Sequence, residues 1–581
     1  MRRPFSIYCD WAMHDELGDD IELDEAMTLK ALDILERWKT EFGVSFDYYL
    51  LDAFWFDPRM PYTAFKKSHW PEGFTRARDR ILALGMTPGL WYDVNSSWLS
   101  PEGWQASLSA AGRGHSLTEG PYSAGLESGW RYALDTWGVR LFKLDFANFY
   151  VAAGGSRLSA EENYARSVGV LRDILSRLRQ EYPDLVVIAY NGFERWPGYL
   201  GSPIGMPLRQ GFDLAWLSVV DYLYSGDPRP SDLVRTNLRR SIDVFQDHQV
   251  WVMKHNGFPL ERVDDHGCMV GSSNTAFYQG SHGFKRTYLG SLARGGQRDI
   301  YYGDPALLSD DEIRFMAAAR KLFFDAFCSG LTTVLVGGEP GNCAWHGTLT
   351  GGAAAGLLYL VNGSCSKVHV EIALPGLLQA RVLFADGTLD IPLSTGAENL
   401  LIELLPEQVA LVGLGDYAEA SMSLGTSADS LQPSQLLPLS VSWQPTSGDS
   451  LTTTYQGNWP SGARLLVTAQ ACTHPQATPW KLASAGLPER FAQEVTRRGE
   501  RPGSSIAHQQ VTIRLHSLHD DSEIEPSAEL PAVPIWAGTS WVARFYTIDR
   551  QIASSGLRVT IEQHLEPSRL IVPGLYAVTA L

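Results

Sequence analysis

The chain has 581 residues, of which 44% are hydrophobic and 19% charged, a balance that excludes intrinsic disorder and predicts a globular protein of several domains. The 65 acidic side chains outnumber the 48 basic ones, and no dense run of Lys or Arg interrupts the net charge of −17, so nucleic acid is not expected as a partner. No stretch of about 18 apolar residues is present to span a bilayer, so a membrane is not expected either.

The N-terminus and the cysteines both indicate a cytoplasmic location. Two arginines precede a short mixed segment that ends at Asp10, which is too short for the apolar region of a secretory signal. The six cysteines are far apart and form no CxxC pair, as is typical of reduced thiols. They are Cys9, Cys268, Cys328, Cys343, Cys365 and Cys472.

The first 329 residues alternate apolar, β-rich runs with amphipathic helical patterns, which is typical of βα units in a parallel sheet. Eight strands are predicted, at Phe5–Trp11, Phe46–Asp52, Pro88–Asp93, Arg140–Phe146, Leu185–Asn191, Tyr222–Asp227, Val250–Asn256 and Asp299–Asp304. Helical patterns between them include Asp24–Phe42, Phe74–Leu84, Ala160–Glu181, Ser231–Gln246 and Ser309–Phe324. We therefore predict an α/β protein that begins with a (β/α)8 TIM barrel.

Each predicted strand carries a polar or acidic residue at or near its C-terminal end. These residues are Asp10, Asp52, Asp93, Asp145, Asn191, Asp227, His255 with Asn256, and Asp304. The C-terminal ends of barrel strands converge on one face, so the set predicts a functional site there. The alternative for any single position is that Asp and Asn are common turn residues after a strand.

After about Gly330 the helical periodicity gives way to short alternating runs broken by Gly and Pro. These runs include Ala355–Val361, Val368–Ala373, Ala380–Phe384, Leu400–Glu403, Arg464–Thr468, Val511–Leu515, Ser540–Thr547 and Leu557–Gln563. The pattern predicts β-sandwich structure after the barrel. We expect a catalytic barrel at 1–329, a β-sandwich at 330–415 and an additional, mostly β domain at 416–581.

The predicted strand that ends near Phe146 carries Lys143 and Asp145 two residues apart, and therefore on the same face. A neighbouring cation favours the ionised acid and would keep Asp145 available as a nucleophile, whereas the alternative is a structural ion pair. A second carboxylate, Asp227, follows another strand and would complete the acid/base pair that glycosidases require. Its alternative role is to start a helix before Pro228.

Three segments resemble the α-galactosidase clan, glycoside hydrolase families 27 and 36, and most closely family 36. LFKLDF is similar to the K-x-D nucleophile strand of that clan. YLLDAFWF is similar to its LDDGWF segment, with Asp52 and Trp55 matching and Ala53 and Phe54 departing. HWPEGFTRARDRILALGMTPGLWYD resembles the run that leads to the strand reading G-L-W in family 36.

The resemblance implies a retaining exo-α-glycosidase, with an α-galactosidase acting on an oligosaccharide as the first choice, and a β-sandwich after the barrel. It makes Asp145 the nucleophile and Asp227 the acid/base. It also implies sugar contacts from Asp52, Trp91 and Lys143, and it makes Trp55, which matches the family segment, a further candidate. The strand ends add Asn191, Asp10 and Asp93 as candidates for substrate binding. The cysteine-containing motif that reads the C2 substituent in the family is replaced here by AYNGFER, with Asn191 and Arg195.

Further acidic residues keep other assignments open. Asp221 is a second candidate for the acid/base, although it would lie at the start of its strand, away from the catalytic face. Asp264, Asp265 and His266 are candidates either for the pocket or for a solvated loop. Lys254 and His255 end a predicted buried strand, where a histidine is more often structural than catalytic.

Other functions also stay open at this stage. They are an α-N-acetylgalactosaminidase or other α-hexosidase, a catalytically silent sugar-binding protein, and a Mg²⁺-dependent barrel lyase or hydrolase that uses Asp93 and Asp145. The fifth strand offers only Asn191 to a magnesium ion, and no HxH pair ends strand one as a zinc site would require. We therefore expect no metal and no cofactor, and the sequence leaves homo-oligomerisation open.

Overall fold

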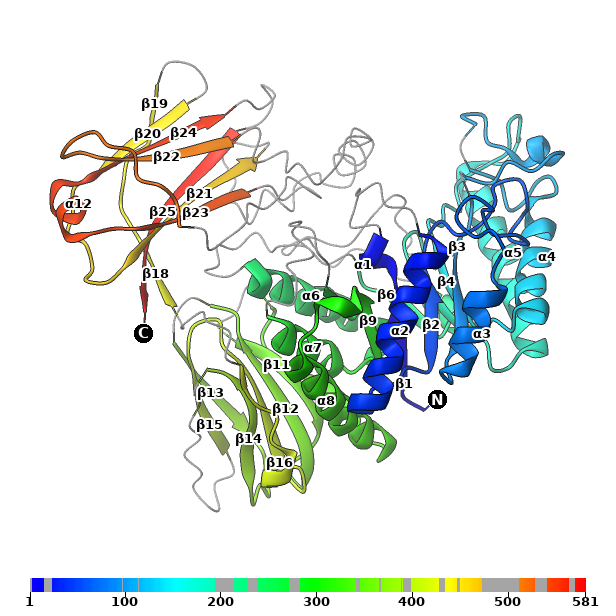
Figure 1. The fold of residues 1–581 in the computed structure, drawn as a ribbon, viewed down its shortest axis with the longest axis horizontal. Helices are drawn as coiled ribbons and strands as arrows, with labels where there is room; N and C mark the ends of the chain where they lie inside the picture. The colour runs from blue at the N-terminus through cyan, green and yellow to red at the C-terminus, as the bar shows by residue number, and fades with distance from the viewer. Residues whose placement is uncertain are drawn as a thin grey trace.

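The computed structural model shows a barrel followed by two β-rich units (Figure 1). It describes residues 3–14, 23–96, 98–112, 114–193, 213–226, 238–270, 283–340, 345–364, 367–387, 389, 399–427, 434–446, 450–472, 511–527, 541–563 and 570–580. Within these ranges no helix is both long enough and apolar enough to cross a membrane.

The barrel strands form one parallel sheet in the order β7-β6-β5-β4-β3-β2-β1-β9-β8. Their bounds are β1 (Phe5–Cys9), β2 (Tyr48–Leu51), β3 (Thr87–Asp93), β4 (Leu141–Asp145), β5 (Val186–Ala189), β6 (Tyr222–Tyr224), β7 (Val263–Asp264), β8 (Cys268–Val270) and β9 (Arg298–Gly303). β1 pairs with both β2 and β9, and residues 265–267 join β7 to β8. The seventh barrel strand is therefore split in two, and the predicted TIM barrel is confirmed.

The predicted seventh strand, Val250–Asn256, is wrong. Most of this segment is the C-terminal part of helix α6 (Leu238–His255), and the strand position is taken by β7 and β8. Residues 243–250 are all buried although five of them are polar, so polarity does not mark the exposed face of this helix. The predicted strand begins with the apolar run Val250–Met253. A short apolar run of this kind cannot be assigned to strand or helix from periodicity.

The other barrel helices follow the sequence signals closely. Their bounds are α1 (Trp11–His14), α2 (Glu25–Phe42), α3 (Thr75–Ala83), α4 (Tyr122–Thr136), α5 (Ala160–Glu181), α7 (Phe284–Ala293) and α8 (Asp310–Cys328). The Asp24 side chain accepts a hydrogen bond from the Met27 backbone N–H, and Ser159 and Ser309 form capping boxes. These side chains satisfy backbone donors that the first turn of a helix leaves free, which explains where the helices begin.

Alternate residues of the strands fill the barrel interior in layers. Ile7, Leu50, Leu141, Ile188 and Ile300 belong to one buried apolar cluster inside the barrel. Two residues further along the same strands, the inward positions are Cys9, Asp52, Lys143, Tyr190 and Tyr302. The period of two thus places a layer of polar and aromatic side chains at the C-terminal end of an apolar core.

The first β-rich unit is a sandwich that packs against the barrel. Its strands are β10 (Thr333–Gly337), β11 (Trp345–Gly351), β12 (Ala355–Asn362), β13 (Val368–Ala373), β14 (Ala380–Asp386), β15 (Asn399–Leu404), β16 (Val409–Gly415) and β17 (Gly425–Ser427). On β12, Leu357 and Tyr359 join the core cluster of the barrel, while Leu358 and Leu360 pack with β13 and β15. Because successive side chains of β12 point to opposite faces, this strand contributes both to the core of the sandwich and to the packing of the sandwich against the barrel.

The second β-rich unit has two four-stranded sheets, β18-β25-β21-β23 and β19-β20-β24-β22 (Figure 1). Its elements are β18 (Ser434–Pro438), β19 (Gln444–Pro445), β20 (Ser450–Tyr455), β21 (Arg464–Cys472), β22 (Val511–Ser517), β23 (Trp541–Thr547), α12 (Arg550–Ser555), β24 (Leu557–Gln563) and β25 (Leu570–Ala580). Leu465 and Val467 on one sheet join a buried cluster with Val559 and Ile561 on the other. This cluster is separate from the barrel core.

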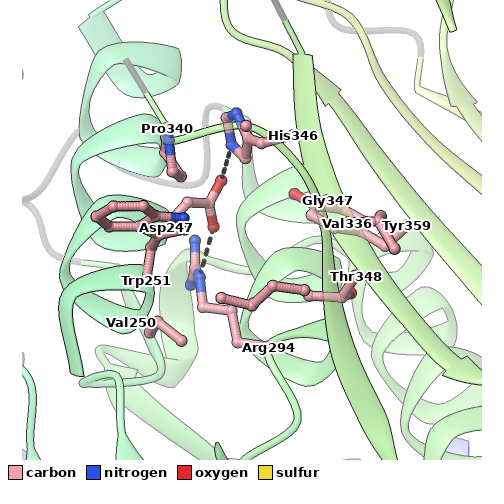
Figure 2. Close-up of a pocket in the computed structure, with 12 residues that line it drawn as sticks. Asp247, Val250, Trp251, Arg294, Val336, Pro340, His346, Gly347, Thr348 and Tyr359 are labelled. Atoms are coloured by element: carbon pink, nitrogen blue, oxygen red, sulfur yellow. Dashed lines mark hydrogen bonds and ion pairs between the residues drawn. The ribbon is translucent and has the colours of Figure 1, made fainter. Parts of the chain in front are cut away.

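A buried carboxylate joins the barrel to the first sandwich at a small recess (Figure 2). Asp247 on α6 accepts a hydrogen bond from Arg294 Nε at 2.7 Å, and its other oxygen lies 2.8 Å from His346 Nε2 on β11. Both carboxylate oxygens are therefore engaged within the protein. The recess is a contact between the barrel and the first sandwich, and its described lining contains none of the predicted site residues.

Candidate active site

Asp145 lies at the C-terminal end of β4, and its carboxylate is held from several sides. Oδ1 accepts hydrogen bonds from the backbone N–H of Phe146 at 2.8 Å, the backbone N–H of Asn191 at 3.2 Å and the side-chain amide of Asn191 at 3.1 Å. Oδ2 accepts one hydrogen bond, from the indole N–H of Trp91 at 3.1 Å. Among the described residues, Oδ1 thus meets three donors and Oδ2 meets one, so Oδ2 is the less constrained.

The environment of Asp145 acts on its pKa in opposite directions. Burial raises the pKa above its ordinary value, because the ionised form loses hydration. The positive charge of Lys143, the indole of Trp91 and the N–H of Phe146 lower it. Burial outweighs these contributions, so the net shift is upward, whereas the sequence led us to expect a nucleophile held ionised by Lys143.

Lys143 makes its direct ion pair with Asp52. Its Nζ lies 2.8 Å from Asp52 Oδ2, and both side chains are almost wholly buried. The thiol of Cys9 donates to the same oxygen at 3.2 Å. Burial opposes the charge on Lys143, but Asp52 and the neighbouring Cys9 and Asp145 raise its pKa further than burial lowers it, so the ammonium stays charged.

Aromatic rings surround the Lys143 ammonium. Its Nζ lies 4.3 Å from the ring centroid of Tyr190, 5.1 Å from that of Tyr302 and 5.8 Å from that of Trp11. Cation–π attraction of this kind stabilises a desolvated ammonium. The sequence analysis missed these rings, although each lies at an inward position of its strand or just beyond it, and the period of two could have indicated them.

Asp10 lies behind Asp52 and is fully buried. Its Oδ1 accepts a hydrogen bond from the backbone N–H of Asp52 at 2.9 Å, and it lies 3.9 Å from Nε2 of the buried His14. Burial raises the pKa of Asp10 to about 8 and lowers that of His14 to about 4. Asp10 therefore positions the backbone of Asp52 from the interior side.

Trp55 and Asp93, two of the predicted substrate contacts, have structural partners. Trp55 is fully buried in the outer core, and its indole N–H donates to the Trp91 carbonyl at 2.8 Å. Asp93 is level with Asp145 across β3 and β4, and its Oδ1 accepts the Asn95 backbone N–H at 3.2 Å. Trp55 thus supports Trp91 from behind and does not join the group around Asp145.

The predicted acid/base, Asp227, lies outside the described residues, as does Arg195. Its alternative, Asp221, precedes β6 at the opposite end of the barrel. There it pairs with Arg179 at 2.7 Å and accepts the backbone N–H of Val187 at 2.9 Å. Asp221 therefore has a structural role on the face away from Asp145.

The break in the seventh strand carries Asp264, Asp265 and His266, and all three are buried. Arg298 pairs with Asp264 at 2.6 Å and with Asp265 at 2.9 Å, which fixes the bend between β7 and β8. The Tyr190 hydroxyl donates to Asp264 Oδ2 at 3.2 Å.

His266 stacks on the ring of Tyr302 with centroids 4.5 Å apart. The segment from Asp264 to His266 thus lies beneath the site, and not in a solvated loop.

His255 and Asn256 lie at the exposed end of α6. Their prediction at a strand end is therefore wrong, for the reason given above for that helix.

Within the described ranges, no group of three or more His, Cys, Asp or Glu side chains is arranged to hold a metal ion. The described site consists of one buried carboxylate, Asp145, beside a buried ion pair, Lys143 with Asp52, with aromatic rings around the Lys143 ammonium. Such an arrangement can present a carboxylate oxygen to an electrophilic carbon and can hydrogen-bond the hydroxyl groups of a ligand.

No family model matches the chain, and no curated protein matches it. Solved structures similar to it include the galactosidase domain of the α-galactosidase–sucrose kinase AgaSK, with 15% identity and a TM-score of 0.47. A variant of the GH36 α-galactosidase AgaA from Geobacillus stearothermophilus, in complex with raffinose, has 14% identity and a TM-score of 0.49. The α-galactosidase from Lactobacillus brevis has 12% identity and a TM-score of 0.48.

Each of these matches covers 71% of this chain. The chain spans only 55%, 56% and 55%, respectively, of the three solved chains. At such identities the likeness assigns no activity. In structure, the chain is similar to α-galactosidases.

Proposed function

We propose that this protein is a retaining exo-α-glycosidase that acts on α-galactosides, with Asp145 as its nucleophile. The supporting observation is the uneven bonding of the Asp145 carboxylate. Within the described part of the chain, Oδ1 meets three donors and Oδ2 meets the Trp91 indole alone, which leaves a lone pair of Oδ2 for an incoming carbon. A nucleophile needs this combination of fixed orientation and one available oxygen.

In the first step, Asp145 Oδ2 attacks the anomeric carbon, and the bond from that carbon to the leaving oxygen breaks. A protonated acid transfers its proton to the leaving oxygen, and a covalent glycosyl-enzyme remains. The Lys143 and Asp52 pair lies beside this reacting centre and would bind sugar hydroxyl groups through the ammonium and the carboxylate. Positive charge on Lys143 also favours the ionised form of Asp145 that the attack requires.

In the second step, the acid has become a base, and it takes a proton from water as the water oxygen attacks the anomeric carbon. The bond to Asp145 then breaks, and the free sugar leaves with its original anomeric configuration. We assign the acid/base role to Asp227 from the sequence, because it follows β6 in the chain. The ion pair of Asp221 with Arg179 at the opposite end of the barrel supports this choice over Asp221.

The test of these roles is azide rescue of two variants, assayed on a 2,4-dinitrophenyl α-galactoside. Asp145→Ala should lose nearly all turnover, and azide should restore part of it with β-galactosyl azide as product, because azide takes the place of the nucleophile. Asp227→Ala should form the glycosyl-enzyme and, with azide, release α-galactosyl azide. Asp221→Ala is the matched control, and no azide product is expected from it.

Two results would overturn the assignments. Wild-type turnover by Asp145→Ala would remove the nucleophile from the mechanism. An α-azide product from Asp221→Ala would transfer the acid/base role to that residue.

The sugar is tested separately from the mechanism. We expect kcat/KM to be higher for an α-galactoside than for an α-N-acetylgalactosaminide or an α-glucoside with the same leaving group. A preference for the glucoside by tenfold, about 1.4 kcal/mol of transition-state discrimination, would overturn the galactoside assignment and leave the mechanism intact. A preference for the N-acetylgalactosaminide would indicate that AYNGFER, which replaces the cysteine-containing family motif, accommodates an acetamido group at C2.

A further inference from the structure

Three aromatic side chains, Phe54, Trp98 and Phe146, form an aromatic platform beside the candidate nucleophile. The rings of Phe54 and Phe146 both contact Trp91 edge to face, with centroids 5.2 Å and 5.6 Å from it, and Trp98 packs on Phe54 at 4.8 Å. Trp91 is 1% exposed and donates its indole N–H to Asp145. The platform is therefore one ring away from the carboxylate that would form the glycosyl-enzyme.

The outer rings of the platform are open to solvent. Trp98 is 53% exposed and Phe146 is 46% exposed. Single exposed apolar side chains are common on protein surfaces, but Trp98 and Phe146 add exposed apolar surface that is linked to the candidate nucleophile through the buried ring of Trp91. Such a surface beside a reacting centre is suited to a flat, apolar group.

The backbone fixes Phe146 in this place. Its φ is +49°, a conformation that bulky residues rarely adopt, and its N–H donates to Asp145 Oδ1 at 2.8 Å. The orientation of its ring is thus tied to the orientation of the carboxylate. Strained backbone that persists at such a position is typical of functional sites.

Two polar side chains of the described loop residues near the platform, Asn95 and Ser96, make hydrogen bonds within the loops themselves. Asn95 donates its amide N–H to the His115 carbonyl at 2.9 Å, and its Oδ1 accepts the Asn148 backbone N–H at 2.7 Å. Ser96 Oγ accepts the backbone N–H of Trp98 at 3.1 Å. A second sugar ring would need partners for its hydroxyl groups, because unpaired polar groups are costly to desolvate. An apolar ring needs none.

We propose that the aromatic platform is the leaving-group subsite and that it selects α-glycosides whose aglycone is a flat apolar ring, such as a benzyl group. The proposal rests on the proposed function, since it assigns the leaving-group side of the same site. It goes beyond that function in naming the class of aglycone.

The test compares benzyl α-galactoside with melibiose, because in both the leaving oxygen belongs to a primary alcohol. It also uses α-galactosyl fluoride, whose leaving group is a single fluoride ion and is too small to contact the platform. For the wild type we expect kcat/KM on benzyl α-galactoside to exceed that on melibiose by about tenfold, the range that one apolar contact surface supplies. In the Trp98→Ala/Phe146→Ala variant this ratio should fall to about one. Leu82→Ala, which removes a similarly exposed apolar side chain from α3, should leave the ratio unchanged.

A wild-type preference for melibiose that the double variant abolishes would overturn the proposal, because the platform would then be a sugar subsite. A preference for benzyl α-galactoside that survives in the double variant would also overturn it. So would a wild type that prefers neither substrate. Failure of the wild type to hydrolyse the fluoride would instead refute the proposed function. In that case, saturation-transfer NMR with benzyl alcohol still tests the platform. Saturation transfer to benzyl alcohol from the wild type but not from the double variant would support binding at the platform, and equal transfer from both proteins would contradict it.

Discussion

The Lys143 ammonium lies 2.8 Å from Asp52 Oδ2, whereas Asp145, two residues along the same strand, takes its hydrogen bonds from Trp91, Phe146 and Asn191. Lys143 thus pairs across the barrel interior and acts on Asp145 through charge alone. Asp52 thus has a direct cationic partner, whereas among the residues that the structure describes Asp145 has hydrogen-bond donors and no direct ion pair.

Removal of Lys143 should destabilise the fold as well as abolish activity. In Lys143→Met the buried Asp52 carboxylate loses its partner, and breaking a buried ion pair in this way costs about 3–5 kcal/mol. Urea unfolding measures this loss. The double variant Lys143→Met/Asp52→Asn should recover most of the stability but none of the turnover. Wild-type stability for Lys143→Met alone would show that Asp52 finds another partner.

The acid limb of the pH–activity profile should depend on Trp91. Burial raises the pKa of Asp145, and activity should fall as the pH drops through that raised value, because only the ionised form attacks. Trp91→Phe removes a hydrogen bond that favours the ionised form, so the limb should move to higher pH. The pH dependence of kcat/KM on α-galactosyl fluoride measures this shift. A limb that stays in place or moves to lower pH would contradict the role given to the indole.

Asp10→Asn should stabilise the protein increasingly as the pH rises. Burial raises the pKa of Asp10 to about 8 in the folded protein, above its ordinary value of 3.8. The stability that the protonated Asp10 contributes to the wild type is therefore full at low pH and is lost as the pH rises toward 8. The asparagine can still accept the Asp52 N–H and does not ionise. Its advantage over the wild type should grow by about 1.4 kcal/mol per pH unit between about pH 5 and about pH 7. Urea midpoints at several pH values measure this slope, and a constant difference would contradict it.

Asp247→Asn should weaken the junction between the barrel and the first sandwich (Figure 2). Although burial opposes the charge, Arg294 and His346 lower the pKa of Asp247 to about 2. The stabilisation is therefore present above the ordinary pKa near 3.8 and is lost as the pH falls toward 2. At neutral pH the free energy of unfolding of the variant should be about 3–5 kcal/mol lower than that of the wild type. This difference should become smaller as the pH falls. Urea unfolding at several pH values measures both effects, and a gap that widens in acid would contradict the sign.

Local signals in the sequence predict most of the barrel. Helix α5 has the bounds that its amphipathic pattern predicts. Ser159 and Glu162 cap its N-terminus, and its apolar stripe repeats with the helical period. Strand β4 follows from a short apolar run that ends in Asp145. Helix α6 could be predicted only in part, because its buried side includes polar residues such as Asp243 and Asp247, whose partners lie on α7 and just after it, and its C-terminal apolar run also fits a strand.

For the candidate site, the sequence by itself determined which residues face the interior. The two-residue period of β4 places Lys143 and Asp145 on one face, and strand ends bring Asp10, Asp52 and Asn191 to the same end of the barrel. Only the tertiary structure decided the partners, since Lys143 binds Asp52 from another strand and Trp55 turns outward behind Trp91. Period and strand direction are local properties of the chain, whereas side chains on different strands meet only through the closure and register of the barrel.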